Sequence, residues 1–111
     1  MKIGILCACA PEFEPYRATL GGESTFIHGM QRTDGVLCGH EISAVFCGIG
    51  KVNAALGTMT LIRDCGADRI IMSGVAGAIR RGVHIGQCVM ITDCIYHDLS
   101  PQLITDYHPS G

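Results

Sequence analysis

The sequence has little charge, and it has no excess of positive charge. Its 111 residues include 8 lysines and arginines against 10 aspartates and glutamates, which gives a formal net charge of −2 with histidine neutral. The basic residues are scattered, and only Arg80 and Arg81 are adjacent. Because the phosphate backbone of a nucleic acid is bound by clustered basic side chains, the sequence argues against a nucleic acid partner. We interpret the Arg80-Arg81 pair as part of a solvated loop rather than as a phosphate site.

Long hydrophobic runs are also missing. No stretch approaches the roughly 20 consecutive apolar residues that cross a bilayer as a helix, so we expect no membrane segment. Met1 and Lys2, followed by the mainly apolar residues 3–10, resemble a short signal peptide, but this stretch is brief and runs directly into Pro11 and Glu12. We therefore interpret it as a first strand. With 48% hydrophobic residues, the chain is too apolar to be disordered and can support one domain with a core.

Cysteine pairs at metal-binding or redox spacing are absent, although cysteine itself is frequent. The chain has 7 cysteines, an odd number, and it has no C-x-x-C sequence. We also expect no export signal. This disfavours an extracellular disulfide framework or a cysteine metal site. We predict reduced thiols in a cytoplasmic protein without a bound metal, with Cys7 and Cys9 alternating on one strand face. Other cysteines lie within or beside apolar strand-like runs: Cys38, Cys47, Cys88 and Cys94.

The first predicted strand leads directly to a carboxylate. Residues 2–8 form a continuous apolar run, which is typical of a strand buried on both faces of a parallel sheet. Pro11 then favours the first turn of a helix, where the helix dipole stabilises the negative charges of Glu12 and Glu14. Glu12 also follows the carboxyl end of the strand, where ligands bind in open α/β sheets. Two interpretations of Glu12 therefore remain open: a helix-start charge, or a general base that the dipole helps to keep ionised.

The segment after this helix predicts an antiparallel meander. Gly21 and Gly22 end the helix. Strand-like residues follow at 24–28, 30–37 and 41–47, and we predict turns at Gly29, Asp34-Gly35 and Gly39 between or within them. Strands joined by such short connections lie antiparallel.

The stretch 44–66 reads as a strand, a glycine turn and a helix. The apolar run 44–47 leads into Gly48 and Gly50, which permit backbone angles that other residues avoid. A helix begins at about Lys51, and a glycine at position 66 suits its C-terminal end. One apolar face of this helix is predicted to pack on the sheet. Its members recur at helical spacing: Val52, Ala55, Leu56, Met59 and Ile62.

The glycine turn does not match either common nucleotide motif. A P-loop requires a glycine where Val45 stands and a serine or threonine where Val52 stands. The dinucleotide fingerprint requires a third glycine in place of Asn53. A helix N-terminus after a strand is still a common ligand site, so a ligand pocket and a purely structural turn both remain open.

The rest of the chain contains a second strand followed by a glycine turn. Residues 68–73 read as a buried strand, and the small residues 74–78 after it either let a ligand approach the backbone or form a tight turn. We predict a loop at 80–86, a strand at 87–96 and irregular structure at 97–111. No internal repeat or low-complexity segment occurs, and no position marks a domain boundary.

Five short blocks in register resemble the N-terminal half of the nucleoside phosphorylase superfamily, and most closely the 5′-methylthioadenosine/S-adenosylhomocysteine nucleosidases. The blocks are Met1-Lys2-Ile3-Gly4-Ile5 with Glu12 following, Gly48-Ile49-Gly50-Lys51-Val52-Asn53-Ala54-Ala55, Gly74-Val75-Ala76-Gly77, residues 83–86, and Tyr96-His97-Asp98. The resemblance implies an α/β fold with a mixed central sheet flanked by helices. Residues 1–111 would then be the N-terminal half of one such domain.

The resemblance also implies an activity and a site. The family hydrolyses the N-glycosidic bond of adenine thionucleosides, as homodimers and without metal or cofactor. Glu12 matches the carboxylate that activates the attacking water. Cys9 and Ile49 match residues that line the pocket, and Ala76 and Gly77 match the turn beneath the ribosyl group. The implied partners are a small purine nucleoside and a second copy of the chain.

Two departures from the family pattern stand out. Val75 replaces a serine that is often found in this turn. Family members are also about twice as long, and their second half supplies the acid that faces the purine, the groups that hold the ribose hydroxyls, and the aromatic ring that stacks on the base. We therefore expect a fragment, a truncated reading frame, or a half that pairs with another chain, and we expect the 111-residue chain to be inactive alone.

Two other functions remain open at this stage. A purine nucleoside phosphorylase would need basic groups gathered around the glycine turns, and Lys51, Arg80 and Arg81 do not evidently converge there. A non-catalytic binding module could instead associate with itself through an open sheet edge.

Overall fold

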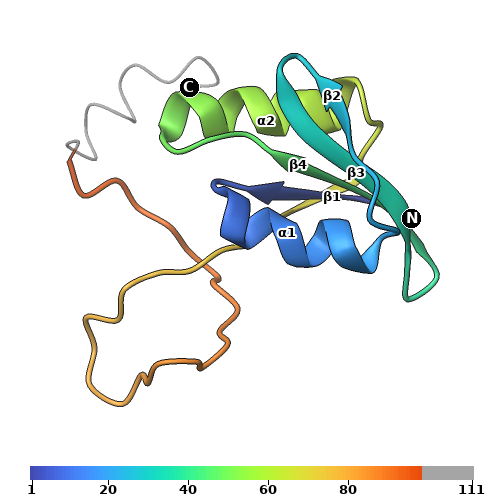
Figure 1. Ribbon diagram of the computed structural model, residues 1–111. Helices are drawn as coiled ribbons and strands as arrows, with labels where there is room; N and C mark the ends of the chain where they lie inside the picture. Colours follow the sequence, from blue (N-terminus) through green and yellow to red (C-terminus); the bar gives the residue numbers. More distant parts are fainter. Residues whose placement is uncertain (99–111) are drawn as a thin grey trace. The chain divides into compact units, whose positions relative to one another are not determined.

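The computed structural model describes residues 1–98, and it divides the chain into the units Met1–Gly77 and Ala78–Gly111. All helices and strands of the described residues lie in the first unit (Figure 1). In chain order they are β1 Lys2–Cys7, α1 Ala10–Thr19, β2 Thr25–Ile27, β3 Met30–Leu37, β4 His40–Phe46, α2 Lys51–Arg63 and β5 Arg69–Met72. Strands therefore precede and follow both helices, as an α/β fold requires.

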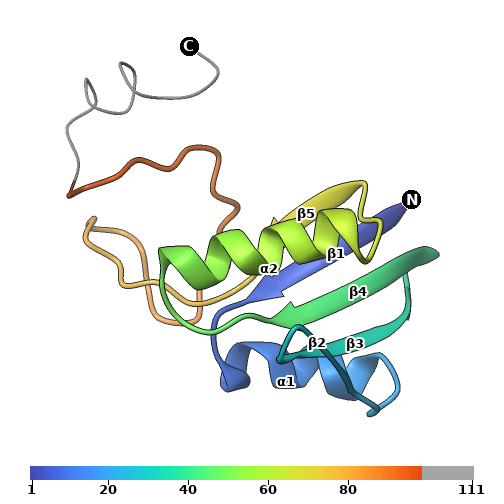
Figure 2. The same cartoon turned by 90° about the horizontal axis from the view of Figure 1, so that it is seen from above.

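The five strands form one mixed sheet in the order β2-β3-β4-β1-β5. β1 lies between β4 and β5 and runs parallel to both, with Ile5 opposite Ala44 on one side and Ile71 on the other. β2, β3 and β4 are antiparallel, which confirms the predicted meander. α1 and α2 cover opposite faces of the sheet (Figure 2). The predicted mixed sheet flanked by helices is therefore confirmed.

Each face of the sheet has its own hydrophobic core. On the α1 face, Phe13 packs against residues of β1 and β4, and it is almost fully buried. On the α2 face, Leu61 does the same. Successive side chains of a strand point to opposite faces, so Ile5 and Cys7 join the first core while Leu6 joins the second. This explains why β1 reads as a continuous apolar run.

The predicted sheet-facing side of α2 is wrong. Val52, Leu56 and Met59 are 75%, 58% and 54% exposed, whereas Gly57, Thr60 and Leu61 are buried. A Cβ at Gly57 would lie 2.5 Å from Cδ1 of Leu6 and 2.6 Å from Cβ of Cys47, so the helix approaches the sheet closely along its small residues. The apolar periodicity predicted that the face with the largest side chains is buried. The helix instead buries a face with smaller residues, because these allow it to approach the sheet closely.

The predicted turn at Asp34-Gly35 is also wrong, because both residues lie inside β3. Asp34 is opposite Ser43, whose hydroxyl donates a hydrogen bond to Oδ1 of Asp34 at 2.6 Å. Gly35 makes room for the end of α1, since a Cβ there would lie 3.0 Å from Cβ of Leu20. The two turns of the meander are His28-Gly29 and Cys38-Gly39, so the predicted turns at Gly29 and Gly39 are confirmed. All four residues have positive φ, as tight two-residue hairpin turns require.

Two further predictions are corrected by the structure. Residues 87–96 form no strand, and residues 78–98 contain no helix or strand at all. A strand is stable only when its backbone pairs with a neighbour, and the apolar side chains of this segment are exposed. β1 ends at Cys7, so Cys9 does not alternate with Cys7 on the strand but precedes α1 as its N-cap. The predicted irregular segment at 97–111 falls mostly outside the described residues.

Candidate functional site

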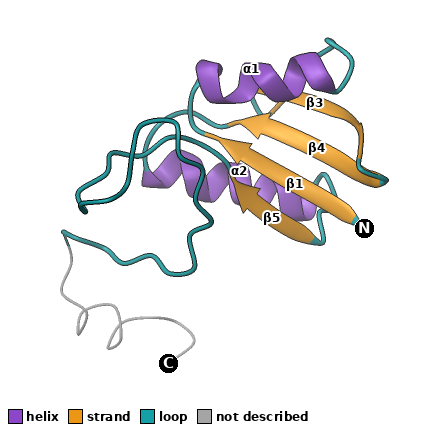
Figure 3. Ribbon diagram, turned by 90° about the horizontal axis from the view of Figure 1, so that it is seen from below, coloured by secondary structure: helices purple, strands orange, loops and turns teal. Residues whose placement is uncertain are grey.

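The candidate site lies where the three parallel strands end. β4, β1 and β5 point the same way, so their carboxyl ends share one edge of the sheet (Figure 3). Three short segments leave this edge: the start of α1 after β1, the glycine turn 48–50 after β4, and residues 73–77 after β5. Loops at this edge form the usual ligand site of open α/β sheets. All of the sequence-predicted site residues lie in these segments.

Glu12 joins two of these segments through its carboxylate. Oε2 accepts a hydrogen bond from the N–H of Ala8 at 3.0 Å, directly after β1. Oε1 accepts one from the N–H of Val75 at 3.1 Å, in the segment after β5. The two oxygens therefore bind the backbone at the ends of two neighbouring strands, and the side chain is partly buried there.

Gly74 provides the space for this arrangement. A Cβ at this position would lie 2.6 Å from Oε1 and 2.9 Å from Cδ of Glu12. Such separations are far shorter than a van der Waals contact, so any larger residue would force the carboxylate or the turn to move. The carboxylate therefore passes close to the backbone at Gly74.

The contacts of Glu12 lower the pKa of its carboxyl group. The main cause is the hydrogen bond from the N–H of Val75. Burial acts in the opposite direction, and the N–H of Ala8 and the side chain and backbone of Cys9 lower the pKa further. Hydrogen bonds to a carboxylate stabilise its charged form. Glu12 is therefore ionised at neutral pH. The sequence predicted ionisation through the helix dipole, and the structure adds hydrogen bonds from the N–H groups of Ala8 and Val75.

The buried thiols beside Glu12 are chemically quiet. The pKa of Cys7 is raised to about 12, mainly by burial and to a smaller extent by the negative charge of Glu12. Its thiol donates a hydrogen bond to the backbone carbonyl of Glu12 at 3.6 Å. Burial also raises the pKa of Cys47, whose thiol lies 3.4 Å from the carbonyl oxygen of Cys7. All seven cysteines are free thiols in the structure, and Cys7 and Cys47 are buried.

The other predicted site residues lie around the same edge. Cys9 is partly buried and caps the start of α1. Ile49 is 78% exposed between Gly48 and Gly50, whose φ values are 93° and 106°, and its carbonyl accepts a hydrogen bond from Nδ2 of Asn53 at 2.8 Å. Ala76 and Gly77 are exposed and follow Val75 directly. These four residues share the edge with Glu12, whose carboxylate binds the N–H groups of Ala8 and Val75.

Sequence reasoning missed a hydrogen bond beside the site. The hydroxyl groups of Tyr16 and Ser73 are 2.6 Å apart. Tyr16 lies four residues after Glu12, hence on the same face of α1, and Ser73 directly follows β5. The spacing from Glu12 was visible in the sequence, but the partner of the tyrosine was not.

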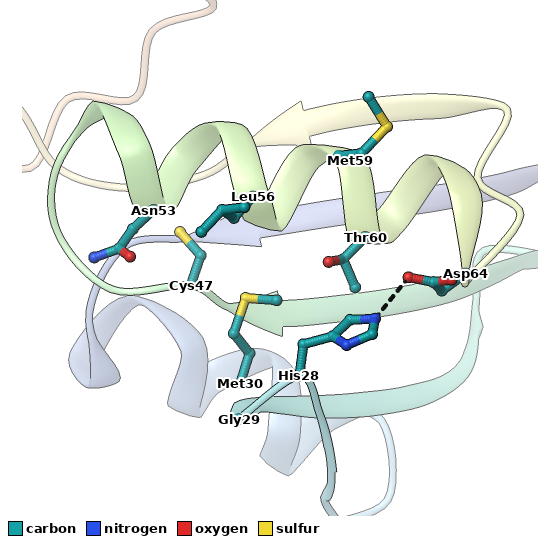
Figure 4. Close-up of a pocket in the computed structure, with 9 residues that line it drawn as sticks. All are labelled: His28, Gly29, Met30, Cys47, Asn53, Leu56, Met59, Thr60 and Asp64. Atoms are coloured by element: carbon teal, nitrogen blue, oxygen red, sulfur yellow. Dashed lines mark hydrogen bonds and ion pairs between the residues drawn. The ribbon is translucent and has the colours of Figure 1, made fainter.

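A separate cavity of about 480 Å³ lies between the β2–β3 turn and α2 (Figure 4). It is lined by His28, Gly29, Met30, Cys47, Asn53, Leu56, Met59, Thr60 and Asp64. Nε2 of His28 and Oδ2 of Asp64 are 2.9 Å apart, and both side chains are largely exposed. None of the predicted site residues lines this cavity, so it is distinct from the site at the sheet edge.

The described part of the chain offers no metal site and no transmembrane helix. Within residues 1–98, no group of three or more histidine, cysteine, aspartate or glutamate side chains could hold a metal ion. Neither α1 nor α2 is long and apolar enough to cross a membrane.

Comparison with known proteins gives a consistent result. The model of the phosphorylase superfamily matches residues 2–110. A 5′-methylthioadenosine/S-adenosylhomocysteine nucleosidase of Bacillus cereus (strain B4264) is 33% identical over 100 residues, which cover 89% of this chain and 43% of the relative. The chain therefore spans less than half the length of the curated relatives that it matches.

Solved structures show the same likeness. The match to the 5′-methylthioadenosine/S-adenosylhomocysteine nucleosidase of S. pneumoniae with a transition-state inhibitor covers 78% of this chain and 38% of the nucleosidase chain. Its TM-score is 0.72, and the two sequences are 32% identical. A mutant nucleosidase of Helicobacter pylori with 5′-methylthioadenosine in the active site covers 76% of this chain and 37% of its own, with a TM-score of 0.68 and 34% identity. The match to a futalosine hydrolase mutant of Helicobacter pylori covers 77% of this chain and 38% of the hydrolase chain, with a TM-score of 0.67 and 33% identity.

Proposed function

The chain belongs to the phosphorylase superfamily, and on that premise we propose that it carries the water-activating part of a nucleosidase. The proposed reaction is hydrolysis of the N-glycosidic bond of adenine thionucleosides, namely 5′-methylthioadenosine and S-adenosylhomocysteine. The observation that carries this proposal is the carboxylate of Glu12, which two backbone N–H groups hold in its ionised form at the ligand-binding edge of the sheet. Residues 1–111 are then the N-terminal half of a single nucleoside phosphorylase-like domain.

The proposed chemistry uses Glu12 as a general base. Its carboxylate accepts a proton from a water molecule as the water oxygen bonds to C1′ of the ribosyl group. The bond between C1′ and N9 breaks, and its electron pair leaves with adenine, which takes up a proton from an acid that we do not assign to this chain. Glu12 suits this role because a carboxylate held ionised can accept a proton, whereas a protonated one cannot.

The remaining predicted residues are proposed to contact the substrate. Cys9 and Ile49 would line the pocket, and Ala76 and Gly77 would lie beneath the ribosyl group. Two observations support this assignment. Ile49 is exposed in the loop after β4, and an added Cβ at Gly77 would meet no atom within 4 Å, so both positions have room for a ligand. No metal or other cofactor takes part in the proposed reaction.

Two related activities are weaker candidates. A phosphorylase would bring a phosphate anion to the edge where Glu12 is ionised, and the repulsion between two negative charges disfavours this. The likeness to a futalosine hydrolase adds futalosine as a second candidate substrate. The hydrolytic role of Glu12 is the same for either nucleoside.

We also propose that the protein is a cytoplasmic homo-oligomer. The exposed apolar side chains of α2 and the edge strand β5, with exposed Ile71 and Met72, support self-association. A non-catalytic self-associating module would share these features, so association alone does not separate the two functions. The seven free cysteines support a reducing compartment.

The test is an assay of adenine release. The 111-residue chain would be compared with a fusion protein, in which the chain is followed by the part of the S. pneumoniae relative that lies beyond the matched region. The substrates are methylthioadenosine, S-adenosylhomocysteine and futalosine, and each is assayed with and without phosphate. We expect the fusion to release the base without phosphate and the 111-residue chain to be inactive. Phosphate-dependent formation of a ribosyl phosphate would instead establish a phosphorylase. Folded fusion protein without either product would favour the non-catalytic module.

A further inference from the structure

The hydrogen bond between Tyr16 and Ser73 connects α1 to the segment that follows β5. The two hydroxyl oxygens are 2.6 Å apart and partly buried, although 57 positions separate the residues in the chain. The ring of Tyr16 packs against the hydrophobic core on the α1 face, which fixes the direction of its hydroxyl group. Ser73 is therefore bound to a side chain whose own position is determined by packing.

The three residues 73–75 are held at several points. The N–H of Ser73 donates to the carbonyl of Leu6 at 3.0 Å, which continues the pairing of β5 with β1. The N–H of Val75 donates to Glu12. Gly74 lies between them against the Glu12 carboxylate. Two side chains of one helix face, Glu12 and Tyr16, thus bind the two ends of this short segment.

The segment 73–75 follows a strand at the edge of the sheet. Among the described strands, β5 pairs only with β1, so β5 is an edge strand of the sheet. Gly74 has no side chain and gives the backbone conformational freedom directly before Val75. A contact that anchors Ser73 therefore restricts where the N–H of Val75 can point.

We propose that Tyr16 is a positioning residue, which fixes residues 73–75 against α1 through Ser73 and so directs the N–H of Val75 to the Glu12 carboxylate. The inference rests on the proposed role of Glu12 as the general base. It assigns to the hydroxyl group of Tyr16 a role that packing of its ring does not provide. Without this hydroxyl, the carboxylate would lose the contact that contributes most to its ionised state.

The Tyr16→Phe variant tests this role because it removes the hydroxyl and keeps the ring. The measurement is an NMR titration of the Glu12 carboxyl carbon in the 111-residue chain. We expect its pKa to rise toward the ordinary value of glutamate. We also expect the amide proton of Val75 to exchange roughly three to ten times faster, as loss of one hydrogen bond predicts.

Variants of Ser73 test the other end of the hydrogen bond. Ser73→Ala should also raise the pKa of Glu12 and speed the amide exchange of Val75. Ser73→Thr should retain the native values because it keeps a hydroxyl. The double variant with Tyr16→Phe and Ser73→Ala should show changes no larger than those of either single variant. Thr19→Ala is the matched control, since it removes a hydroxyl of α1 that bonds to the carbonyl of Pro15. It should leave Glu12 and Val75 unchanged.

The inference is overturned if Tyr16→Phe leaves both the pKa of Glu12 and the exchange of Val75 at their native values. It is also overturned if Tyr16→Phe and Ser73→Ala act additively. These measurements report on geometry and need no turnover, so they are independent of the proposed reaction. If instead Glu12→Gln retained full activity in the extended fusion, the proposed function would be wrong while the result for Tyr16 would stand. In that fusion, Tyr16→Phe should lower kcat more than it raises KM.

Discussion

The N–H of Val75 donates a hydrogen bond to Oε1 of Glu12 across 3.1 Å, although the two residues are 63 positions apart in the chain. The bond joins the helix that follows β1 to the segment that follows β5. The charge and orientation of the carboxylate therefore depend on how the edge strand is placed beside β1. Any change that moves residues 73–75 should affect Glu12 before it affects the rest of the fold.

Gly74→Ala should displace the Glu12 carboxylate. The added Cβ would lie 2.6 Å from Oε1, so either the side chain or the turn must move and the bond to Val75 should break. We expect the pKa of Glu12 to rise in the NMR titration. Gly77→Ala is the control for this measurement, because its Cβ would meet no atom within 4 Å. Equal titration curves for Gly74→Ala and the native chain would contradict the observed contact.

The lowered pKa of Glu12 predicts a loss of stability in acid. The folded state lowers this pKa from its usual 4.5. The ionised carboxylate therefore stabilises the folded state fully at a pH above 4.5, and this stabilisation is lost as the pH falls through the pKa of the folded state. Glu12→Gln carries no charge at any pH. The difference in unfolding free energy between the native chain and Glu12→Gln should therefore shrink as the pH is lowered from 7 to about 3, measured by denaturant titration.

Glu14→Gln provides the comparison for this experiment. The pKa of Glu14 is also lowered, mainly through its hydrogen bonds with Arg17, but that pair is solvent-exposed. Exposed ion pairs contribute little to stability. A pH dependence that vanishes in Glu14→Gln and persists in Glu12→Gln would show that the acid sensitivity has another origin.

Gly57→Ala should destabilise the protein, although alanine is the better helix former. Helix propensity alone would stabilise α2 by about 1 kcal/mol. The added Cβ would lie 2.5 Å from Leu6 and 2.6 Å from Cys47, and overpacking of this kind costs roughly 1–3 kcal/mol. Denaturant unfolding of Gly57→Ala and of Thr58→Ala, which changes the next residue of the same helix, would separate the two effects. An increase in the stability of Gly57→Ala would refute the close approach of α2.

The face of α2 illustrates what the sequence could and could not predict. The helix itself and its start after Gly50 follow from local signals, because helical periodicity and glycine turns depend on near neighbours. The buried face depends on how closely the helix approaches the sheet, and this is a tertiary property. The large residues Val52, Leu56 and Met59 misled the prediction, while Gly57 carried the useful signal.

The candidate site divides in the same way. Pro11 and the end of β1 placed Glu12 at the right edge of the sheet, since chain order fixes which end of a strand a helix follows. The hydrogen bond to Val75 and the pairing of Tyr16 with Ser73 required the register of β5 beside β1, which no local pattern encodes. The strand predicted at 87–96 failed for a related reason, because a strand needs a partner that its own residues cannot specify.

The exposed face of α2 should drive self-association. Val52, Leu56 and Met59 present apolar surface on successive turns, and burial of such surface favours association. Leu56→Glu should shift the 111-residue chain toward smaller species in light scattering at micromolar concentration, while its circular dichroism stays unchanged. Thr58→Glu introduces the same charge on a less exposed part of the helix and serves as the control. A native chain that is already monomeric would remove the support for a homo-oligomer through this face.

Glu12→Gln should abolish turnover in the extended fusion. Glutamine keeps the size of the side chain but cannot accept a proton from water, so loss of the general base should lower kcat about a hundredfold to ten-thousandfold. Substrate binding should change little. Glu14→Gln is the matched control, because Glu14 lies on the same helix and pairs with Arg17 at the surface instead of joining the strand ends. If both variants kept native turnover, the carboxylate of Glu12 would have only its structural role, which is to bind the N–H groups of Ala8 and Val75.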